Sequence, residues 1–501
     1  MRSAIEASPA RSERAPHDSR AASLVRGHAW TLTVWAATTT WALALFLIAR
    51  QRFDQFRYAH YDLGNMVQAV WSTAHGRFLE NTHGLTGEQT SRLGSHVDPI
   101  LAALAPLWLV FPSPLLLAFV QVFAVAIGAV PVFWIARRRL SSARVAGLLA
   151  LAYLAYPWTA WAALDVFHPV VLAIPLFLFC VWFLETGRLG PFAIFAVLAA
   201  LTGELMGLTI AALGVWYALA HGKRKAGVAI AALGTAWTLV ALKVIVPAYS
   251  GGESLFFGAY ENVGGSPWGV VRTTFTDPTV VLSALTGGRD LLYLILLVAP
   301  IGGVCLLAPG LTAVAIPQLA ANMLADRQHT TDPHVHYVAG VLPFLFAAIA
   351  VGLARVAPAR RDNVAGLVVT IAAVFTIAVG PWPGTLLGAA DWDSRGTLDT
   401  SADHVRALER AVGLVPDGAA VSATNRAGSH LAERQYYYPV PLLGRAEWAV
   451  VDTSDSWIPE SFAGTDDPRA VSMFRERLER STHWREVFEQ DGVYVYEREG
   501  R

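Results

Sequence analysis

Acidic and histidine side chains recur just outside the long apolar segments of this chain, where chemistry at a membrane surface would take place. Asp62 stands at the head of the segment YDLGNMVQAVWSTAH, which follows the first long apolar run. A carboxylate there can act as a general base and remove the proton of an attacking hydroxyl group. Asp is also a favoured N-cap, whose carboxylate accepts backbone N–H bonds where a helix begins. Capping and catalysis are compatible, and both stay open for Asp62.

Glu204 is the second informative acid. It interrupts the apolar stretch 191–220, with only Thr202 and Gly203 as polar neighbours. An ionisable residue within or near the membrane is costly and indicates a functional site. A plain turn at the outer surface, between two short helices of a tight hairpin, is the alternative interpretation.

Other polar residues lie close to the predicted helix starts. Asp98 precedes Pro99, and an N-cap followed by proline explains that pair well. His96 is less easily explained by capping. It is a candidate phosphate donor, or a metal ligand together with Asp98, although a solvated loop histidine is the alternative. Arg92 is an outer cation that could hold a lipid phosphate, or simply an interfacial side chain.

Asp165 and His168 lie at the outer end of a predicted hairpin, where capping again competes with substrate binding. His334 and His336 have a spacing typical of metal ligands, but two histidines alone do not make a metal site. The sequence therefore indicates no cofactor, and a divalent metal stays an open possibility.

Composition shows what kind of protein positions these residues. Of the 501 residues, 54% are hydrophobic and only 15% are charged, whereas soluble domains carry about 25% charged residues. Repeated long apolar runs predict a mainly helical, polytopic membrane protein. The segment from Trp382 to Arg501 contains 20 acids and 13 Arg, a net charge of −7, and the preceding residues carry +7. A membrane part and an acidic soluble part are thus joined in one chain.

The apolar runs, beginning with residues 30–49, predict about eleven transmembrane helices over residues 29–381. The proposed inner segments hold 16 of the 25 Lys and Arg of the membrane part but only 5 of its 18 acids. By the positive-inside rule, the tail 1–28 is cytoplasmic and the acids and histidines face outward. This tail is predicted to be disordered, a cleaved signal peptide being the alternative. The predicted location is the bacterial plasma membrane, with the C-terminal domain outside.

Two outer elements are predicted in more detail. The loop 50–100 contains an amphipathic helix that would lie in the membrane interface, with Leu63, Met66 and Val70 on its apolar face. After a linker at 382–396, residues 397–501 read as a small α/β domain. Its predicted elements are the helices HVRALERAVGL and DPRAVSMFRERLERS, strands at 421–424 and 448–454, and a hairpin turning at Asp491-Gly492.

Several unusual segments, in order, resemble one family. They are YDLGNMVQAVWSTAHGRFLEN, SRLGSHVDPILAALAPLWLVF, DVFHPVVLAIPLFLF, LTGELMGLTIAALGVWY and VSATNRAGSHLAERQYYYPVP. They are similar to the bacterial and archaeal membrane proteins of domain of unknown function 2079, a family that resembles GT-C glycosyltransferases. One departure concerns Glu204. Thr202-Gly203-Glu204-Leu205 stands where the family usually has a Lys-Glu-Asp type run, so only Glu204 is carried over.

The resemblance implies a GT-C-like membrane glycosyltransferase. It would transfer a sugar from a polyprenyl-phosphate carrier to an extracytoplasmic acceptor, with Asp62 as the base. A transporter or flippase is one alternative, because Thr202–Glu204 and Pro309–Gly310 resemble breaks in transporter helices. A non-catalytic scaffold is another. Acids gathered on one face favour the enzyme, and no motif indicates a nucleic-acid partner.

Overall fold

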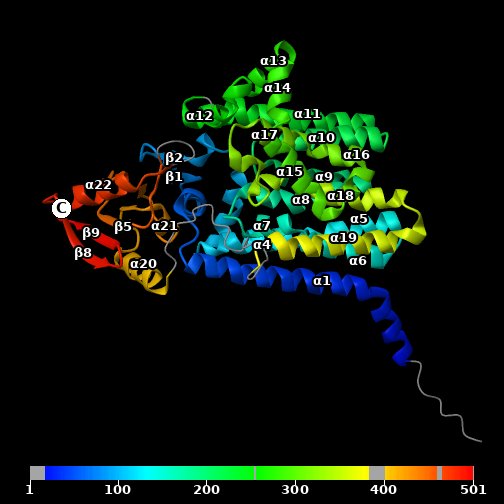
Figure 1. The fold of residues 1–501 in the computed structure, drawn as a ribbon, viewed down its shortest axis with the longest axis horizontal. Coiled ribbons are helices and arrows are strands. Elements are labelled where there is room, and N and C mark those ends of the chain that lie inside the picture. Colours follow the sequence, from blue (N-terminus) through cyan, green and yellow to red (C-terminus); the bar gives the residue numbers. More distant parts are fainter. Residues whose placement is uncertain (1–16, 253–254, 383–400, 460–464, 500–501) are drawn as a thin grey trace, which may run out of the picture.

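The computed structural model describes residues 17–252, 255–382, 401–459 and 465–499. Figure 1 shows a large helical part and, at one end of it, a small mixed part coloured orange to red. Strands β1 (Glu80–Thr82) and β2 (Gln89–Ser91) form an antiparallel pair at the junction of the two parts. The predicted linker 382–396 lies, apart from Trp382, outside the described residues.

The helical part begins with α1 (His17–Asp54), the longest helix described. Short 3-10 or π turns connect many of the elements that follow, among them η1 (His60–Gly64), η4 (Pro169–Leu172), η10 (Gln328–Thr331) and η11 (His336–Val338). The other helices of this part are α2 (Asn65–Ala74), α3 (Ala105–Trp108), α4 (Leu115–Ile127), α5 (Ala129–Leu140), α6 (Ala143–Ala155), α7 (Pro157–Leu164), α8 (Ala173–Glu185), α9 (Leu189–Ala200), α10 (Met206–Ala220), α11 (Arg224–Val240), α12 (Val246–Ser250), α13 (Pro267–Thr276), α14 (Pro278–Leu285), α15 (Gly288–Val298), α16 (Pro309–Thr312), α17 (Ile316–Leu324), α18 (Leu342–Gly352) and α19 (Pro358–Val379).

Several of these helices are long and apolar enough to cross a membrane, which makes the chain a polytopic membrane protein. Among the described residues there are five such segments, or up to seven if each of two bent helix pairs is one span. The five are His28–Asp54, Leu115–Leu140, Arg224–Ser250, His336–Arg355 and Pro358–Val379. Shorter apolar helices, including α9 and α10, are separated by tight turns. The number of eleven crossings therefore stays a prediction.

Helices α10 and α11 approach each other closely because glycines line their contact. A Cβ atom at Gly207 would lie 2.3 Å from the carbonyl oxygen of Gly234, and one at Gly214 would lie 2.7 Å from that of Gly227. Small residues at matching positions let helix backbones meet in a membrane, where no hydrophobic effect drives helices together.

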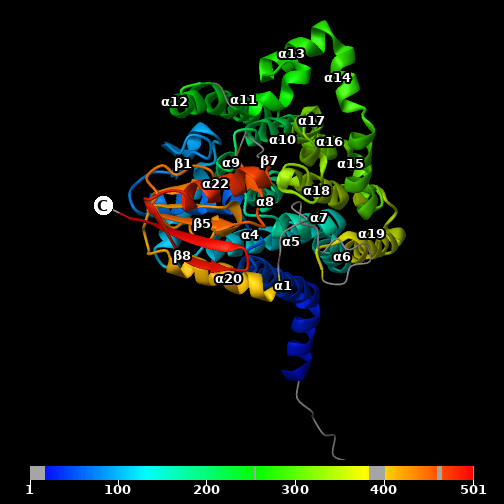
Figure 2. The same ribbon diagram turned by 60° about the vertical axis from the view of Figure 1, so that its left-hand side comes forward.

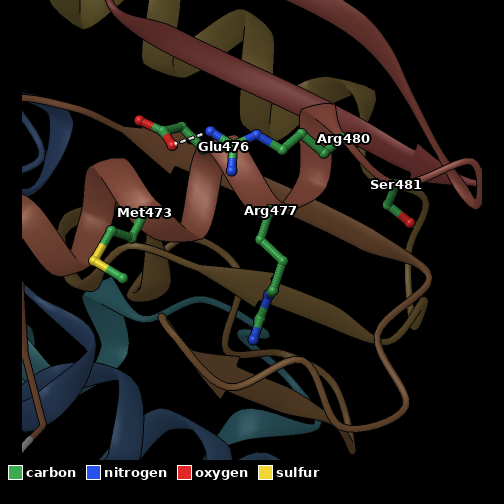
Figure 3. A pocket seen from close by; sticks show the side chains of 5 residues that line it. All are labelled: Met473, Glu476, Arg477, Arg480 and Ser481. Carbon is green, nitrogen blue, oxygen red and sulfur yellow. Dashed lines mark hydrogen bonds and ion pairs between the residues drawn. The ribbon is translucent and has the colours of Figure 1, made fainter.

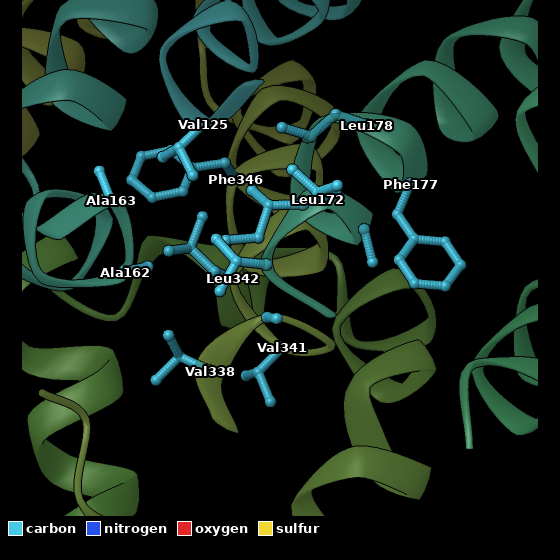
Figure 4. Close-up of a cluster of buried hydrophobic side chains, with 14 of the residues drawn as sticks. Val125, Ala162, Ala163, Leu172, Phe177, Leu178, Val338, Val341, Leu342 and Phe346 are labelled. Carbon is cyan, nitrogen blue, oxygen red and sulfur yellow. The ribbon is translucent and has the colours of Figure 1, made fainter. Parts of the chain in front are cut away.

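The loops that carry the candidate residues rest on a common apolar core. Figure 4 shows Ala163 of α7, Leu172 of η4 and Val338 of η11 converging with side chains of α4, α8 and α18. All three are almost fully buried, with relative exposures of 2%, 6% and 0%. Dense packing of this kind holds the ends of these elements in fixed positions.

The C-terminal part is an α/β domain with helices on both faces of one sheet. The five strands lie in the order β4-β3-β5-β9-β8, with β3 parallel to β4 and β5 and the hairpin β8–β9 antiparallel. Helix α20 packs on one face and α22 on the other. The strands are β3 (Val421–Ala423), β4 (Tyr437–Pro439), β5 (Trp448–Asp452), β8 (Trp484–Gln490) and β9 (Val493–Arg498). A separate pair is formed by β6 (Trp457–Ile458) and β7 (Thr465–Asp466), and the helices are α20 (Ala402–Leu414), α21 (Asn425–Gly428) and α22 (Pro468–Glu479).

Every element predicted for this domain is present. Asp491 and Gly492, both with positive φ, form the hairpin turn between β8 and β9, as a two-residue hairpin loop requires. Figure 2 shows α20 and α22 on opposite sides of the strands.

Two predictions about local structure differ from the observed fold. Residues 17–28, predicted as part of a disordered tail, belong to α1, because a helix already nucleated by the first span is extended at little cost through Ala, Leu and Arg. Residues 1–16 lie outside the described residues. Helix α2 does not expose a polar face either: Gln68 and Ser72 are 0% and 1% exposed. The polar side of α2 faces protein rather than water.

Candidate functional site

Four predicted or suspected residues meet at one point beside the helical part. The carboxylate of Asp165 lies 3.1 Å from Nδ1 of His336 and 3.9 Å from Nδ1 of His168. The rings of His168 and His336 stack with their centroids 3.6 Å apart. Nε2 of His168 in turn lies 3.8 Å from Oδ1 of Asp62. We call Asp62, Asp165, His168 and His336 the acid–histidine cluster.

Asp62 does not occupy a capping position. It is the third residue of the π turn η1, whose N-cap is Ala59, and α2 follows directly with Gly64 as its N-cap. Its side chain is 26% exposed. π turns are rare and occur often at functional sites. Capping, left open by the sequence, therefore does not explain an acid at this place.

Gly64 is required for the shape of η1. A Cβ atom there would lie 2.3 Å from Nδ1 of His60. The His60 ring also stacks on Tyr437 of the C-terminal domain, with centroids 3.5 Å apart. Burial lowers the pKa of His60 to about 3, so this imidazole is a neutral packing surface. His60 thus fixes the turn that carries Asp62.

The orientation of His168 turns its Nε2 atom toward the carboxylate of Asp62. Its Nδ1 lies 2.7 Å from the carbonyl oxygen of Val166, a contact that places the ring proton on Nδ1. Burial lowers the pKa of His168 to about 4. The neutral ring therefore presents the lone pair of Nε2 to the carboxylate of Asp62, and two facing acceptors need a positive charge or a proton between them.

The donor set of Asp165, His168 and His336 fits a divalent metal ion. One ligand atom from each lies within 4.8 Å of the others. Mixed imidazole and carboxylate ligands are those of Zn²⁺ and related transition metals. Backbone contacts, such as Val166 to His168, supply the outer support that metal-binding histidines usually have.

Gln121 of α4 holds the loop between α7 and η4. Its side chain donates to the carbonyl oxygen of Asp165 at 2.7 Å and accepts from the backbone N–H of His168 at 2.9 Å. It is 1% exposed. Burial raises the pKa of the Asp165 carboxyl to about 6, with His168 opposing and Asp62 reinforcing the rise. The protonation state of this pair is therefore set by burial and by neighbours that Gln121 keeps in place.

Arg327 is a cation whose charge acts on two residues beside the cluster, Tyr61 and His329. Burial and the charge of Asp62 raise the pKa of Tyr61 to about 12, against opposing effects of Arg327 and Arg92. Burial and the Arg327 guanidinium lower the pKa of His329. Arg327 immediately precedes η10 and His329 lies within it, and the next short helix, η11, begins at His336. A positive group beside a carboxylate–histidine cluster is suited to an anionic substrate group.

Four other predicted residues form two separate pairs, and the first is Arg92 with Asp98. Arg92 binds Asp98 through Nε and Nη2 at 2.8 and 2.7 Å, and both side chains are less than a tenth exposed. Asp98 occupies the N-cap position before Pro99, but it makes no side-chain cap bond. Asp98 thus stands at the predicted N-cap position, but its carboxylate pairs with Arg92 instead of capping the helix.

His96 and Glu204 also meet. Nδ1 of His96 lies 3.4 Å from Oε1 of Glu204, and the backbone N–H of Val97 donates to Oε2 at 3.1 Å. Burial alone would raise the pKa of Glu204, but the contacts with His96 and Val97 lower it below its ordinary value. The turn between α9 and α10 is thereby tied to the loop before Asp98. A direct contact of Glu204 with the acid–histidine cluster is not among the described interactions.

The C-terminal domain grips the backbone that leads to Asp62. Residues 425–430, which we call the clamp, bind five backbone groups of residues 53–61. Asn425 Oδ1 accepts from the N–H of Tyr61 at 2.9 Å, and the guanidinium of Arg426 donates to the carbonyl oxygens of Gln55 and Phe56 at 3.2 and 3.1 Å. Ser429 donates to the carbonyl oxygen of Tyr58, and His430 Nε2 lies 3.1 Å from that of Phe53. The C-terminal domain therefore contributes to the site by holding this backbone.

Figure 3 shows a separate hollow lined by Met473, Glu476, Arg477, Arg480 and Ser481. These residues come from α22 and the turn after it, and none belongs to the acid–histidine cluster. Arg480 is paired with Glu476 at 2.7 Å. Exposed pairs of this kind are ordinary surface features.

Three parts of the site were missed or undervalued from the sequence. His336 was noticed only as a histidine spacing, although it completes the cluster. Arg327 is the only Arg or Lys between the apolar runs 311–325 and 337–354, a signal that could have identified it. Gln121 lies inside an apolar helix, and nothing in a single sequence separates it from an ordinary polar core residue.

Residues 52–495 match the model of a family described as predicted membrane protein (DUF2079). No curated protein matches the sequence. Among solved structures, ArnT from Cupriavidus metallidurans in the apo state has a TM-score of 0.52 and 14% identity, and covers 94% of this chain and 98% of its own. The same protein bound to undecaprenyl phosphate gives a TM-score of 0.48 at 13% identity, with the same coverage. An oligosaccharyltransferase from Archaeoglobus fulgidus in the apo form has a TM-score of 0.43 and 12% identity, and the match covers 92% of this chain and 74% of the oligosaccharyltransferase chain. The fold is GT-C-like.

Proposed function

We propose that this chain, which belongs to the DUF2079 family of predicted membrane proteins and has a GT-C-like fold, is a membrane glycosyltransferase. It would transfer a sugar from a polyprenyl-phosphate carrier to an extracytoplasmic acceptor. The observation that carries the proposal is the position of Asp62: a partly exposed carboxylate, outside any capping role, facing the Nε2 atom of His168.

The reaction assigns one task to Asp62. Its carboxylate accepts the proton of an acceptor hydroxyl group while the hydroxyl oxygen attacks the anomeric carbon of the donor sugar. A new glycosidic C–O bond forms, the bond from the anomeric carbon to the phosphate oxygen breaks, and the polyprenyl phosphate leaves with the electron pair. His168 and Asp165 orient this carboxylate and adjust its surroundings.

The donor phosphate needs positive charge close to Asp62. Arg327 supplies it, because its guanidinium already acts on Tyr61 and His329 beside the cluster. Arg92 is less suited, since Asp98 neutralises it in a buried pair. A divalent metal held by Asp165, His168 and His336 would add Lewis-acid stabilisation of the leaving phosphate. The donor class is further supported by the fold shared with ArnT, which has been solved bound to undecaprenyl phosphate.

The outer face of the bacterial plasma membrane is the proposed side of the reaction. The loop charges predict a cytoplasmic N-terminus. The C-terminal domain contacts the loop 53–61 and hence lies on the same side as Asp62. Donor and acceptor would meet at headgroup level, where the spans end.

Replacing Asp62 tests the proposal. In membranes containing equal amounts of folded protein, transfer of radiolabelled sugar from a mixture of bacterial polyprenyl-phosphate sugars is expected to fall about 10²–10⁴-fold in Asp62→Asn. Asp54→Asn is the matched control, because Asp54 forms only an exposed pair with Arg50. Activity of Asp62→Asn within a few fold of wild type would contradict the role of Asp62. Energy-dependent movement of a solute, with no new glycosidic bond, would favour a transporter instead.

A further inference from the structure

A groove lies between the β1–β2 turn and the C-terminal domain, apart from the acid–histidine cluster. Its volume is about 540 Å³, within the range of small-molecule sites, about 300–1,000 Å³. One wall is formed by Thr86 to Gln89 of the turn, and the other by residues 435–445. The two walls come from the two parts of the chain, so the groove exists only when the parts are docked.

Aromatic rings line the domain side of this groove. Tyr436 and Tyr438 alternate with Tyr437 along the edge of the sheet, so they project from one face while Tyr437 projects from the other. The rings of Tyr436 and Tyr438 are nearly parallel, 9° apart in orientation, with centroids 6.5 Å apart. At this separation they are not in face-to-face contact, and Tyr436 is half-buried. Tyr437 instead packs against His60.

Planar polar groups surround these rings. The guanidinium of Arg445 lies 5.5 Å from the ring centre of Tyr436, and the side chains of Gln89 and Gln435 line the same groove. Arg445 is exposed, and neither it nor the Gln435 side chain has a hydrogen bond or ion pair with the residues that the structure describes. Their donors and acceptors are available to a ligand.

Glycines let the backbone of both walls pack closely on the ring of Tyr438, which is 3% exposed. A Cβ atom at Gly444 would lie 2.3 Å from the Tyr438 ring, and one at Gly87 would lie 3.2 Å from it. Both glycines also have positive φ, of 47° and 72°, a conformation that side-chain-bearing residues rarely adopt. Backbone from both walls therefore reaches the aromatic surface.

A peptide cannot add to the sheet here. Strand β4 is at the edge of the sheet, but the N–H of Tyr437 and the carbonyl oxygens just before the strand are already bonded. Gln68 donates to the carbonyl oxygens of Arg434 and Gln435 at 3.1 and 2.9 Å, and Thr82 accepts from the N–H of Tyr437 at 3.4 Å. Strand addition needs those groups free. Recognition in the groove must come from side chains.

We propose that this groove binds a saccharide chain. A sugar ring has an apolar C–H face, which suits a tyrosine ring, and a rim of hydroxyl groups, which suits amide and guanidinium groups. The proposal rests on the proposed function in one respect: the bound saccharide is taken to be the acceptor. It would hold that acceptor at a distance from Asp62 and determine which glycan is extended.

The groove is connected to the reacting centre by short contacts. The β1–β2 turn touches Tyr438 at Gly87, and a Cβ atom at Gly84 of the same turn would lie 3.9 Å from the ring of Tyr61, the residue before Asp62. The ring of Tyr61 also lies 4.8 Å from that of Trp457. A saccharide chain leaving the groove along this turn would approach the ring of Tyr61, the residue before Asp62.

The test measures binding separately from transfer. Saturation-transfer NMR and calorimetry on the full-length protein in detergent would use maltohexaose and chitohexaose as neutral probes and hexagalacturonate as an acidic one. At least one probe is expected to bind, and Tyr436→Ala or Arg445→Ala should weaken it about tenfold. Tyr494→Ala is the matched control, because Tyr494 also lies under an arginine, Arg475, in the same domain but outside the groove.

Two outcomes overturn the inference: none of the three probes binds, or both groove variants bind as tightly as Tyr494→Ala. Asp62→Asn separates this result from the proposed function. If the wild type shows no transferase activity but both it and Asp62→Asn bind a probe, the result supports the groove and rejects only the proposed function. If the wild type transfers sugar but binds no probe, and Tyr436→Ala and Arg445→Ala transfer at the same rate, the result rejects only the groove.

Discussion

Asn425 and Tyr61 are 364 positions apart in the chain, yet the side-chain oxygen of Asn425 accepts a hydrogen bond from the backbone N–H of Tyr61 at 2.9 Å. Asp62 is the next residue. The position of the candidate base thus depends on a domain that begins after the last predicted span. Together with Arg426, Ser429 and His430, this contact makes the clamp a positioning device for the turn η1.

The first prediction concerns this hydrogen bond. Asn425→Ala removes the acceptor for the Tyr61 N–H, and the turn carrying Asp62 should shift. Misplacement of a catalytic group by about 1 Å can cost roughly 10²-fold in rate, so transfer is expected to fall by up to that factor while the protein remains folded. Ser456→Ala, which removes only a bond to the exposed Asp466, is the control. A fall in folded protein that matches the fall in activity would indicate a merely structural role.

A second prediction concerns pH. His430 lies between the rings of Phe53 and Phe56, with centroids 4.0 and 3.9 Å away, and burial lowers its pKa to about 4. The unfolded or undocked chain binds the proton more tightly, so docking is fully stable above pH 6.5 and weakens as the pH falls toward 4. The change from 6.5 to about 4 corresponds to about 3 kcal/mol.

Hydrogen exchange of residues 53–61 would measure this effect. Exchange should accelerate between pH 6.5 and 4.5, after correction for the intrinsic rate, and His430→Phe should abolish the acceleration because Phe keeps the stacking without the titration. His483→Phe, at an exposed position of the same domain, should leave the pH dependence as in wild type. An equal pH dependence in His430→Phe would assign it to another group.

The third prediction concerns a metal ion. Chelation with EDTA is expected to lower transfer, and Mn²⁺ or Zn²⁺ should restore it, because Asp165, His168 and His336 offer a mixed oxygen and nitrogen donor set. Loss of one outer partner of a metal ligand typically reduces metal affinity about 10–100-fold. Gln121→Ala, which frees the loop of Asp165 and His168, should therefore raise the metal concentration needed for half-maximal transfer. Full activity after exhaustive chelation would exclude a required metal.

The last prediction separates two roles for Arg92. Removing one member of a buried ion pair typically costs about 3–5 kcal/mol, so Arg92→Ala should lower the thermal unfolding midpoint measurably. Arg50→Ala breaks a pair with side chains 62% and 54% exposed, and such pairs contribute about 0–1 kcal/mol. A donor-binding role for Arg92 would appear differently, as a raised KM with an unchanged unfolding midpoint.

The predicted and observed structures agree where local pattern decides the outcome. Apolar runs predicted a helical, polytopic membrane protein, which the structure confirms. The turn residues Asp491 and Gly492 identified the last hairpin, because a positive φ at both positions suits few residues. The tight turn at Thr202–Glu204 was predicted from the break in one apolar stretch. Each of these features depends on residues close together in the sequence.

The candidate site was only partly predictable, because its geometry depends on distant contacts. Asp62, Asp165 and His168 were identified from their positions at helix ends, but nothing local shows that His336 stacks on His168 across 168 positions of chain. Helix α2 was predicted to be an amphipathic helix lying in the membrane interface. Gln68 is instead buried and donates hydrogen bonds to Arg434 and Gln435. A local sequence pattern cannot predict contacts with residues so far along the chain.

The clamp also sets an order of events during biosynthesis. Translation at about 5–20 residues per second would separate the synthesis of Tyr61 from that of Asn425, 364 positions later, by roughly 20–70 s. The acid–histidine cluster is complete in sequence once His336 has been made, 89 positions before Asn425, but at that point the turn carrying Asp62 still lacks the residues that hold it. A nascent chain in the membrane would thus acquire its candidate base in position only after the last domain has been synthesised and docked.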